Sequence, residues 1–447
     1  MYNIIFSLLL TYIVVLPLAR TPRLPLLAQR IQLSEIVFFF FFFFWIADLI
    51  KNKKPLVRDT GLNKPFLFFI SCCMLSFLHS SDLFLSTIEL SGLLYLFIMF
   101  AAVIDVTDGK ERLDAIIKVW ILTTAVILIW ALAGWFIAMI TGERNLFCRV
   151  YHNRFPYIKN VCRVQSTFRH PQALGNYLIA SLGFVFSEFF LTNDKKYKSY
   201  LKVMIFFMWL VTFATITKSV LGFAVSFFII YSHFYKAKEL KFKVVKYLLI
   251  FLIAVAFCAS TFFSSIYVRH YKIENLHKGP FKINIDYSYD VRFAKKIAAL
   301  EMLKRHPFLG VGLSMYPLYV DKLNKENYFK KFGPIHYYPL GEEGISYLPI
   351  GKPHNDILGY LAETGILGGS AFIIFIAVFL HLGFSNLKKT DDYYFKTRLF
   401  CFLASFIGIF VDSMDVDVFK LRHLWLLMAV SLALIIHKDR ICKVSQK

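Results

Sequence analysis

The chain has 447 residues, of which 57% are hydrophobic and 18% aromatic, and its formal net charge is +22. This composition excludes an ordinary soluble domain, which carries less apolar sequence. Apolar windows of roughly 17–25 residues recur along the chain, and that is the length with which a helix crosses a bilayer. A membrane β-barrel would show shorter, alternating segments. We therefore expect an all-α, polytopic helical membrane protein in which residues 1–447 form a single integral membrane domain.

The apolar windows predict about twelve transmembrane helices. The first window has no basic segment before it and no small-residue cleavage site after it, so we expect it to stay in the protein as a span. In chain order the windows cover residues 1–19, 33–50, 65–79, 84–105, 115–140, 172–191, 199–216, 219–235, 245–265, 366–384, 397–413 and 421–437.

Basic residues set the expected orientation. They gather in the connections 51–64, 192–198, 236–246 and 385–398 and in the tail, which all lie on one side in a twelve-helix count. The positive-inside rule places that side, and with it both termini, in the cytoplasm. Three Arg in the connection 20–32 lie on the outer side, against the pattern. Loop charge of this kind explains the net charge without a nucleic-acid partner.

Two sizeable outer segments remain, residues 142–171 and 266–365, and both are rich in Arg, His and Tyr. Long loops cross the membrane regardless of charge, so ordinary solvated side chains are one explanation. We favour an anionic ligand at the outer surface, because both segments have the same bias. Cys148 and Cys162 lie in the first segment, where the compartment would be oxidising, and the sequence leaves open whether they form a disulfide. No Cys/His cluster has metal-ligand spacing.

The first outer segment ends in basic residues placed before an expected helix. Arg163 and Arg169 precede Pro171, and proline is favoured in the first turn of a helix. Helix N-termini attract anions, and Arg binds phosphate in a bidentate manner. Interfacial Arg contacts with membrane lipid are the alternative. Lys218 lies in a tight outer turn between two apolar windows and is either a phosphate contact or an anchoring lysine.

The longest polar segment holds most of the residues that could do chemistry. It contains Arg292, then His306-Pro-Phe-Leu-Gly-Val-Gly312, and later Pro353-His-Asn-Asp356, with Glu363 before Thr-Gly-Ile-Leu-Gly368. His354 would lie near the outer surface, where an imidazole with a pKa of about 6.5 suits a general base. Asn355 follows it, and Glu363 stands in an apolar setting, where an ionisable side chain usually has a function.

A D-x-D pattern occurs in the last outer loop, at Asp415 and Asp417, near Asp412, Lys420 and Arg422. Such a pattern can bind a divalent metal, but substrate contact or plain loop acidity is the favoured interpretation. The chain contains no G-x-x-x-x-G-K-[ST], G-x-S-x-G or H-E-x-x-H motif. That argues against an ATPase, an α/β-hydrolase and a zinc protease.

Taken together, the motifs resemble the O-antigen ligase and polymerase superfamily of membrane glycosyltransferases, over roughly residues 140–425. The layout is similar too, with about twelve helices and a large outer loop between helices 9 and 10, a GT-C-like arrangement. Three sequence patterns carry the likeness: Arg163…Thr167-Phe168…His170-Pro171…Leu174-Gly175; Arg292 followed by Pro307-Phe-Leu-Gly310-Val-Gly312; and His354-Asn355…Leu361-x-Glu363-x-Gly365-Ile-Leu-Gly368.

The resemblance implies a mechanism at the periplasmic face of the bacterial inner membrane. A glycan on undecaprenyl pyrophosphate is transferred with inversion to an acceptor hydroxyl, such as one on lipid A–core, without metal or cofactor. Arg292 would bind the pyrophosphate and His354 would be the base. The expected substrate-binding residues are Arg163, Arg169, Lys218, Asn355 and Glu363.

One position departs from the family pattern. The family commonly has an arginine in a T-x-[ST]-R pattern in the outer turn near Thr217, and this chain has Val220 there. Lys218, Arg163 or Arg169 would have to supply the missing cation.

Several functions share these features. A ligase that uses lipid A–core is our first expectation, and a repeat-unit polymerase or a pilin-glycosylating relative follows. A lipid-linked oligosaccharide flippase or a transporter is the non-enzyme alternative. Transporters often show internal repeats and polar residues at mid-membrane. The chain shows no repeat, and its polar residues concentrate in outer loops, which favours an enzyme.

Overall fold

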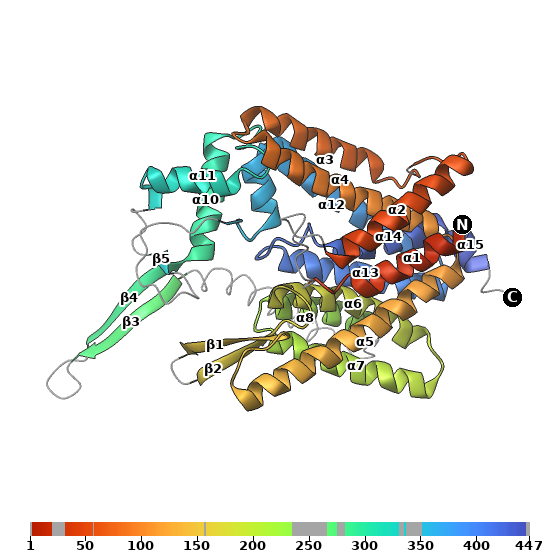
Figure 1. The fold of residues 1–447 in the computed structure, drawn as a ribbon, viewed down its shortest axis with the longest axis horizontal. Coiled ribbons are helices and arrows are strands. Elements are labelled where there is room, and N and C mark those ends of the chain that lie inside the picture. Colours follow the sequence, from red (N-terminus) through yellow and green to blue (C-terminus); the bar gives the residue numbers. More distant parts are fainter. Residues whose placement is uncertain are drawn as a thin grey trace.

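A computed structural model describes residues 2–19, 32–56, 58–155, 158–234, 266–274, 282–329, 335–336 and 351–443. Most of these residues form helices arranged as one bundle (Figure 1). Seven helices are long and apolar enough to cross a membrane: α2 (Leu33–Lys51), α4 (Leu83–Val106), α5 (Lys110–Thr141), α6 (Pro171–Leu191), α7 (Lys195–Ala214), α12 (Asp356–Lys388) and α13 (Tyr393–Asp412).

Shorter apolar helices fill the other expected positions. They are α1 (Tyr2–Val15), α8 (Ser219–Phe234) and α14 (Arg422–Ile436). The expected third span is α3 (Asn63–Leu75) followed by a 3-10 turn, Ser76–His79. The expected ninth span, 245–265, lies outside the described residues. The prediction of a polytopic helical membrane protein is confirmed, and the count of twelve stays a prediction.

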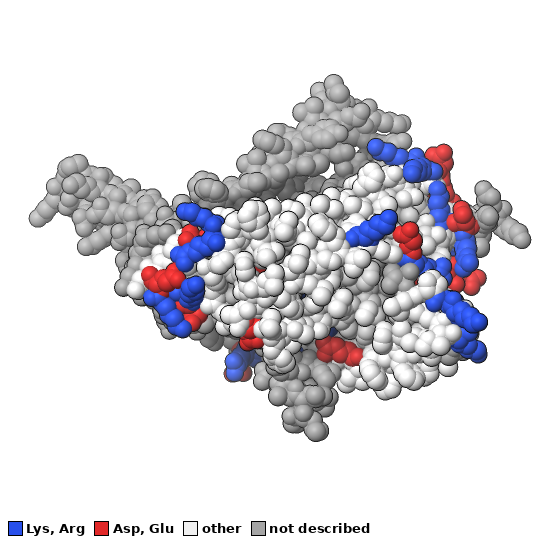
Figure 2. Space-filling view, turned by 90° about the horizontal axis from the view of Figure 1, so that it is seen from above, with Lys and Arg blue, Asp and Glu red and all other residues white. Residues whose placement is uncertain are grey.

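The helices pack through aromatic side chains. Trp45, Trp120 and Trp425 are fully buried, and α13 packs against α6 and α8 while α14 packs against α4. In Figure 2 a wide part of one face is uncharged, and charged side chains gather toward its two ends. That distribution is what a bilayer requires, because a charged side chain in the hydrocarbon region is costly.

Both ends of the described chain lie at one end of the bundle, where α15 (Lys438–Lys443) follows α14 (Figure 1). Arg440 of α15 pairs with Asp108 just after α4, and the Tyr2 hydroxyl donates to the carbonyl of Asp105. The first and last helices therefore meet at the same end of the bundle.

The opposite end carries the elements outside the bundle (Figure 1). β1 (Cys148–Phe155) and β2 (Ile158–Val164) form an antiparallel hairpin, and a disulfide joins Cys148 to Cys162. β3 (Ile266–Glu274) pairs antiparallel with β4 (Lys282–Asp290), which pairs parallel with β5 (Ile335–His336). Two helices follow, α10 (Val291–Arg305) and α11 (Tyr316–Lys325). The expected outer loop 266–365 thus contains regular structure.

α12 begins earlier than the expected tenth span and is kinked. Gly365 has φ +66° and ψ −169°, so helical geometry is interrupted there. The loop before α11 packs into the kink. The Ile366 amide donates to the Pro307 carbonyl at 2.8 Å, and the Gly312 amide donates to the Glu363 carbonyl at 2.9 Å. Because these bonds satisfy backbone groups that the kink frees, the two glycine-containing motifs form one structural unit.

Candidate active site

The connection between α13 and α14, residues 413–421, organises the candidate site. The start of α12 holds it in place. The Asp356 carboxylate accepts hydrogen bonds from the Val418 and Phe419 amides at 2.9 and 3.0 Å, and the Asn355 side-chain amide donates to the Met414 carbonyl at 2.9 Å. Asn355 also caps α12, because its Oδ1 accepts from the Leu358 amide at 2.8 Å.

Asp415 in this connection lies among three cations. Its Oδ2 is 3.0 Å from Lys218 Nζ and 2.5 Å from an Arg292 guanidinium nitrogen, and its Oδ1 is 3.2 Å from Lys296 Nζ. Lys218 comes from the turn before α8, and the other two lie one turn apart on α10. The carboxylate is 1% exposed. Three cations and one carboxylate give this cluster a formal charge of +2 (3 − 1).

Burial and neighbouring charges shift the pKa values of this cluster in opposite directions. Burial raises the pKa of Asp415, but Arg292, Lys218 and Lys296 outweigh it and the net pKa is lowered. Burial also lowers the pKa of Lys218, although Asp415 opposes that effect. The ionised carboxylate of Asp415 holds the three cationic side chains close together. Because the cluster keeps a net positive charge, it can still attract an anion.

His354 lies beside this cluster. Its Nδ1 is 3.9 Å from Asp417 Oδ2, which is an electrostatic contact but too long for a hydrogen bond. Its backbone has φ +57°, an uncommon conformation for a residue other than glycine. Burial, followed by the charges of Lys295 and Arg292, lowers the pKa of His354 to about 3. The imidazole is therefore neutral at pH 7 and able to accept a proton.

The two arginines predicted near the first outer segment contact backbone. Arg163 Nε donates to the Thr215 carbonyl, and Arg169 Nε donates to the Ala19 carbonyl, both at 3.0 Å. Arg163 thereby braces the turn that carries Lys218. Substrate contact by either arginine stays a prediction. Lys218 supplies the cation of this turn, and whether it replaces the family arginine at the position of Val220 stays a prediction too.

Glu363 is buried and contacts backbone. Its Oε1 accepts from the Tyr316 amide at 3.4 Å. A substrate contact by Glu363 is not tested by these interactions and stays a prediction. Its side chain also lines a small polar cavity of about 20 Å³ beside the 413–421 connection. The other lining residues are Lys352, Pro353, Asp356, Gly359, Tyr360, Asp417 and Lys420.

Two residues join the site that the sequence analysis did not name, Lys295 and Lys296. Lys296 follows Arg292 by four residues, so the helical spacing was a usable signal. His170, which belongs to the first motif of the resemblance, lies near the site as well. His170 caps α6, with Nδ1 accepting from the Gln172 amide at 3.3 Å, and burial and then Arg163 lower its pKa to about 4.

The two aspartates of the D-x-D pattern have different surroundings. Asp415 contacts cations and Asp417 faces His354. Within the described ranges, no group of three or more His, Cys, Asp or Glu side chains is arranged to hold a metal ion. Independence from metal stays a prediction.

A comparison with protein families identifies part of this region. Residues 203–373 match the family model described as O-antigen ligase. The match includes Lys218, Arg292, His354 and Glu363, while Arg163, Arg169 and Asp415 lie outside it. No curated protein matches the chain. The family match confirms, for this part of the chain, the resemblance drawn from the motifs: residues 203–373 are similar to the O-antigen ligase family, whose members are membrane glycosyltransferase-like enzymes.

Proposed function

We propose that this protein is an O-antigen ligase of the bacterial inner membrane. It transfers a glycan from undecaprenyl pyrophosphate to lipid A–core at the periplasmic face, with inversion at the anomeric carbon. One observation carries the proposal: Lys218, Arg292 and Lys296 converge on Asp415 next to a neutral histidine, at the end of the bundle away from both termini.

The leaving group explains the need for the cations. When the bond between the anomeric carbon and the pyrophosphate oxygen breaks, the electron pair leaves with undecaprenyl pyrophosphate as additional negative charge. Positioned cations stabilise charge that develops in a transition state more than they stabilise the ground state. Arg292 and Lys296 on α10 and Lys218 before α8 approach from two elements, so they can contact different pyrophosphate oxygens.

The acceptor explains the need for a base. A sugar hydroxyl attacks the anomeric carbon from the face opposite the pyrophosphate, and its oxygen forms the new glycosidic bond. The hydroxyl proton passes to His354. The Nδ1 of His354 faces Asp417, which leaves Nε2 for this proton, and the carboxylate stabilises the imidazolium that results.

Substrate binding would also make His354 a stronger base. Arg292 and Lys295 contribute to the lowered pKa of the free site. An anionic pyrophosphate among these cations offsets their charge at the histidine and so raises its pKa toward the ordinary range. Base strength is then highest when the donor is in place.

The test is the lipopolysaccharide ladder of cells that lack the gene, rescued with wild type, Arg292→Ala or His354→Ala. We expect the null strain to show lipid A–core without polymer while full-length glycan accumulates on undecaprenyl pyrophosphate. Neither variant should restore the ladder, because one lacks the pyrophosphate cation and the other lacks the base. His354→Ala should lose turnover but keep donor binding. If the protein were a transporter, the same variant would either keep most of its activity or lose substrate binding itself.

Arg305→Ala is the matched control. Arg305 lies on the same helix, pairs with Glu301 and Glu326, and should not affect transfer. Full rescue by Arg292→Ala at normal expression would contradict the pyrophosphate role. Core capped with one repeat unit in the null strain would identify the polymerase instead, and an unchanged ladder would move the search to pilin or another acceptor.

A further inference from the structure

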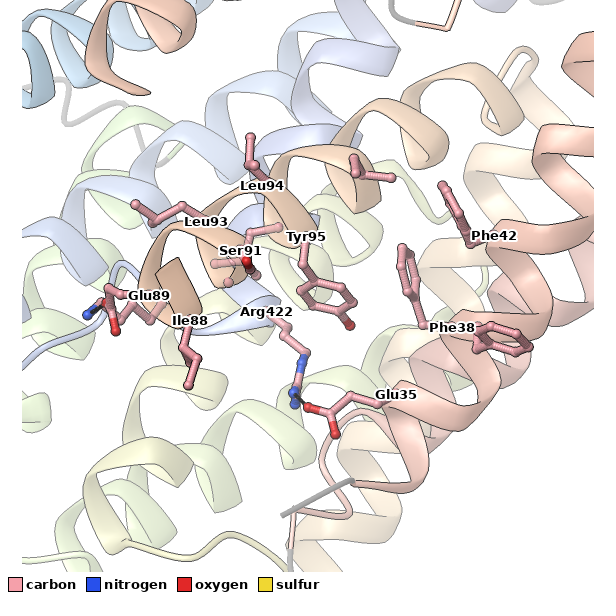
Figure 3. Close-up of a pocket in the computed structure, with 15 residues that line it drawn as sticks. Glu35, Phe38, Phe42, Ile88, Glu89, Ser91, Leu93, Leu94, Tyr95 and Arg422 are labelled. Atoms are coloured by element: carbon pink, nitrogen blue, oxygen red, sulfur yellow. Dashed lines mark hydrogen bonds and ion pairs between the residues drawn. The ribbon is translucent and has the colours of Figure 1, made fainter. Parts of the chain in front are cut away.

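An apolar groove of about 690 Å³ lies between α2 and α4 (Figure 3). Phe38 and Phe42 line it from α2, and Leu94 and Tyr95 line it from α4. Phe39 on its rim is 64% exposed and Leu94 is 40% exposed, so the groove opens sideways out of the bundle. In a membrane, that opening faces lipid.

Two ion pairs close one end of the groove. Arg422 at the start of α14 binds Glu35 of α2, and Lys420 binds Glu89 of α4. Figure 3 shows Arg422 reaching toward Glu35 beside Tyr95. Each pair is formally neutral, so the pairs do not by themselves select an anion. They place the polar boundary of the groove at the end of the bundle that carries the candidate active site.

The groove has the depth of one leaflet. Its lining runs along α4 from Ile88 to Ile98. Ten residues of helix rise roughly 15 Å, which is about half of a hydrocarbon core of roughly 30 Å. An acyl chain that is anchored in the outer leaflet reaches this depth, whereas a polyprenyl chain is much longer than the groove.

The 413–421 connection joins the groove to the active site. Along it, Asp415 contacts the cations, Asp417 faces His354, and Lys420 reaches Glu89 at the groove. Lys420 lines both the groove and the small polar cavity that Asp417 also lines. The connection thus links the cation cluster, the proposed base and the groove in chain order.

We propose that this groove binds an acyl chain of the lipid-anchored acceptor. The inference rests on the proposed function, because it assigns the two ends of the 413–421 connection to two substrates. In an inverting transfer, the nucleophile attacks the anomeric carbon on one face while the leaving group departs from the opposite face. The cations on Asp415 receive the pyrophosphate of the donor, and the groove beyond Lys420 anchors the molecule that carries the attacking hydroxyl.

Gly92 offers a way to fill the groove without disturbing the bundle. It lines the groove, and a Cβ at this position meets no heavy atom within 4 Å. We expect Gly92→Phe to raise the KM for lipid A–core at least tenfold while kcat and the KM for the donor stay unchanged. Thr87→Phe is the matched control, since Thr87 is an exposed residue of α4 that does not line the groove.

Photolabelling tests the groove directly. Lipid A with a diazirine in one acyl chain is added to the full-length protein in phosphatidylcholine nanodiscs. We expect the label on peptides from Leu83–Val106 of α4, its loss in Gly92→Phe and its persistence in Thr87→Phe. Both variants should melt at the temperature of the parent protein.

Three results would overturn the inference: label confined to other helices, equal displacement by unlabelled phosphatidylethanolamine, or preferential labelling of the groove by a diazirine-bearing undecaprenyl phosphate. The ladder experiment tests the proposed function and the labelling experiment tests the groove, so either proposal can be contradicted without the other. An unchanged ladder with label in the groove would overturn the proposed ligase function and leave an acyl-lipid site, whereas a lost ladder with label elsewhere would overturn the groove alone.

Discussion

At the scale of single residues, the site combines a neutral histidine with an ionised aspartate. His354 is one-third exposed, yet burial and neighbouring cations lower its pKa to about 3. Asp415 is buried, yet three cations keep its pKa below the ordinary value. Both groups are therefore deprotonated at pH 7, and pKa values shifted by burial and by specific charged neighbours are frequent at functional sites.

The titration of His354 predicts a pH dependence of stability. Its pKa is about 3 in the folded protein and about 6.5 when unfolded. Between these values the unfolded chain binds more protons, so the free energy of unfolding decreases as the pH falls from about 6.5. His354→Gln removes this contribution, and we expect a shallower loss of thermal stability between roughly pH 6.5 and 4.

Differential scanning fluorimetry in detergent across this pH range provides the measurement. The variant should still lose some thermal stability as the pH falls, because the pKa of Asp415 is lowered in the folded protein and its protonation is therefore destabilising. His381→Gln, which changes an exposed histidine near the far end of α12, controls for the substitution itself. Identical slopes for His354→Gln and the parent protein would contradict the prediction.

At the scale of elements, the site depends on the kink in α12. The Asn355 cap fixes where the helix begins, and Gly365 interrupts it ten residues later. The Pro307–Gly312 loop fills the interruption and positions the end of α10, which carries Arg292 and Lys296 at its start. The two glycine motifs therefore help to place the cations relative to His354.

Substitution of Gly365 tests this role. A Cβ at Gly365 would come 2.2 Å from the Phe308 carbonyl oxygen, and φ is +66°. Strain of this kind costs about 1–3 kcal/mol. We expect Gly365→Ala to lower the melting temperature and to reduce transfer, because the loop and the kink must separate. Gly92→Ala, at a helical glycine with open space, is the control; equal melting temperatures for the two variants would contradict the prediction.

At the scale of the whole molecule, the bundle has two different ends. Both termini lie at one end, and the hairpins, α10 and α11 lie at the other (Figure 1). Basic residues of the connections 51–64 and 385–398 favour the first end as cytoplasmic. The orientation is a prediction, and the active site is periplasmic only if it holds.

Accessibility of introduced cysteines measures the orientation. Lys325→Cys at the end of α11 and Lys388→Cys at the end of α12 both replace exposed lysines. With an impermeant maleimide applied to spheroplasts, we expect the first to react and the second to react only after lysis. The reverse pattern would invert the topology and place the candidate site in the cytoplasm.

The sequence by itself determined the class of the protein and indicated residues of the candidate site. Hydropathy is a local property, so apolar windows such as 172–191 and 397–413 predicted helices that the structure confirms as α6 and α13. His354 and Lys218 were singled out from residue type and local setting, and Arg292 from the resemblance to the family. Their roles stay predictions.

Only the tertiary structure decided which of these residues meet. Asp415 and Arg292 are 123 residues apart, and no local pattern connects them. The kink at Gly365 depends on a loop some sixty residues earlier, and the groove depends on how α2 and α4 diverge. Local sequence sets what each segment prefers, whereas contacts between distant segments follow from how the apolar faces of all the helices pack at once.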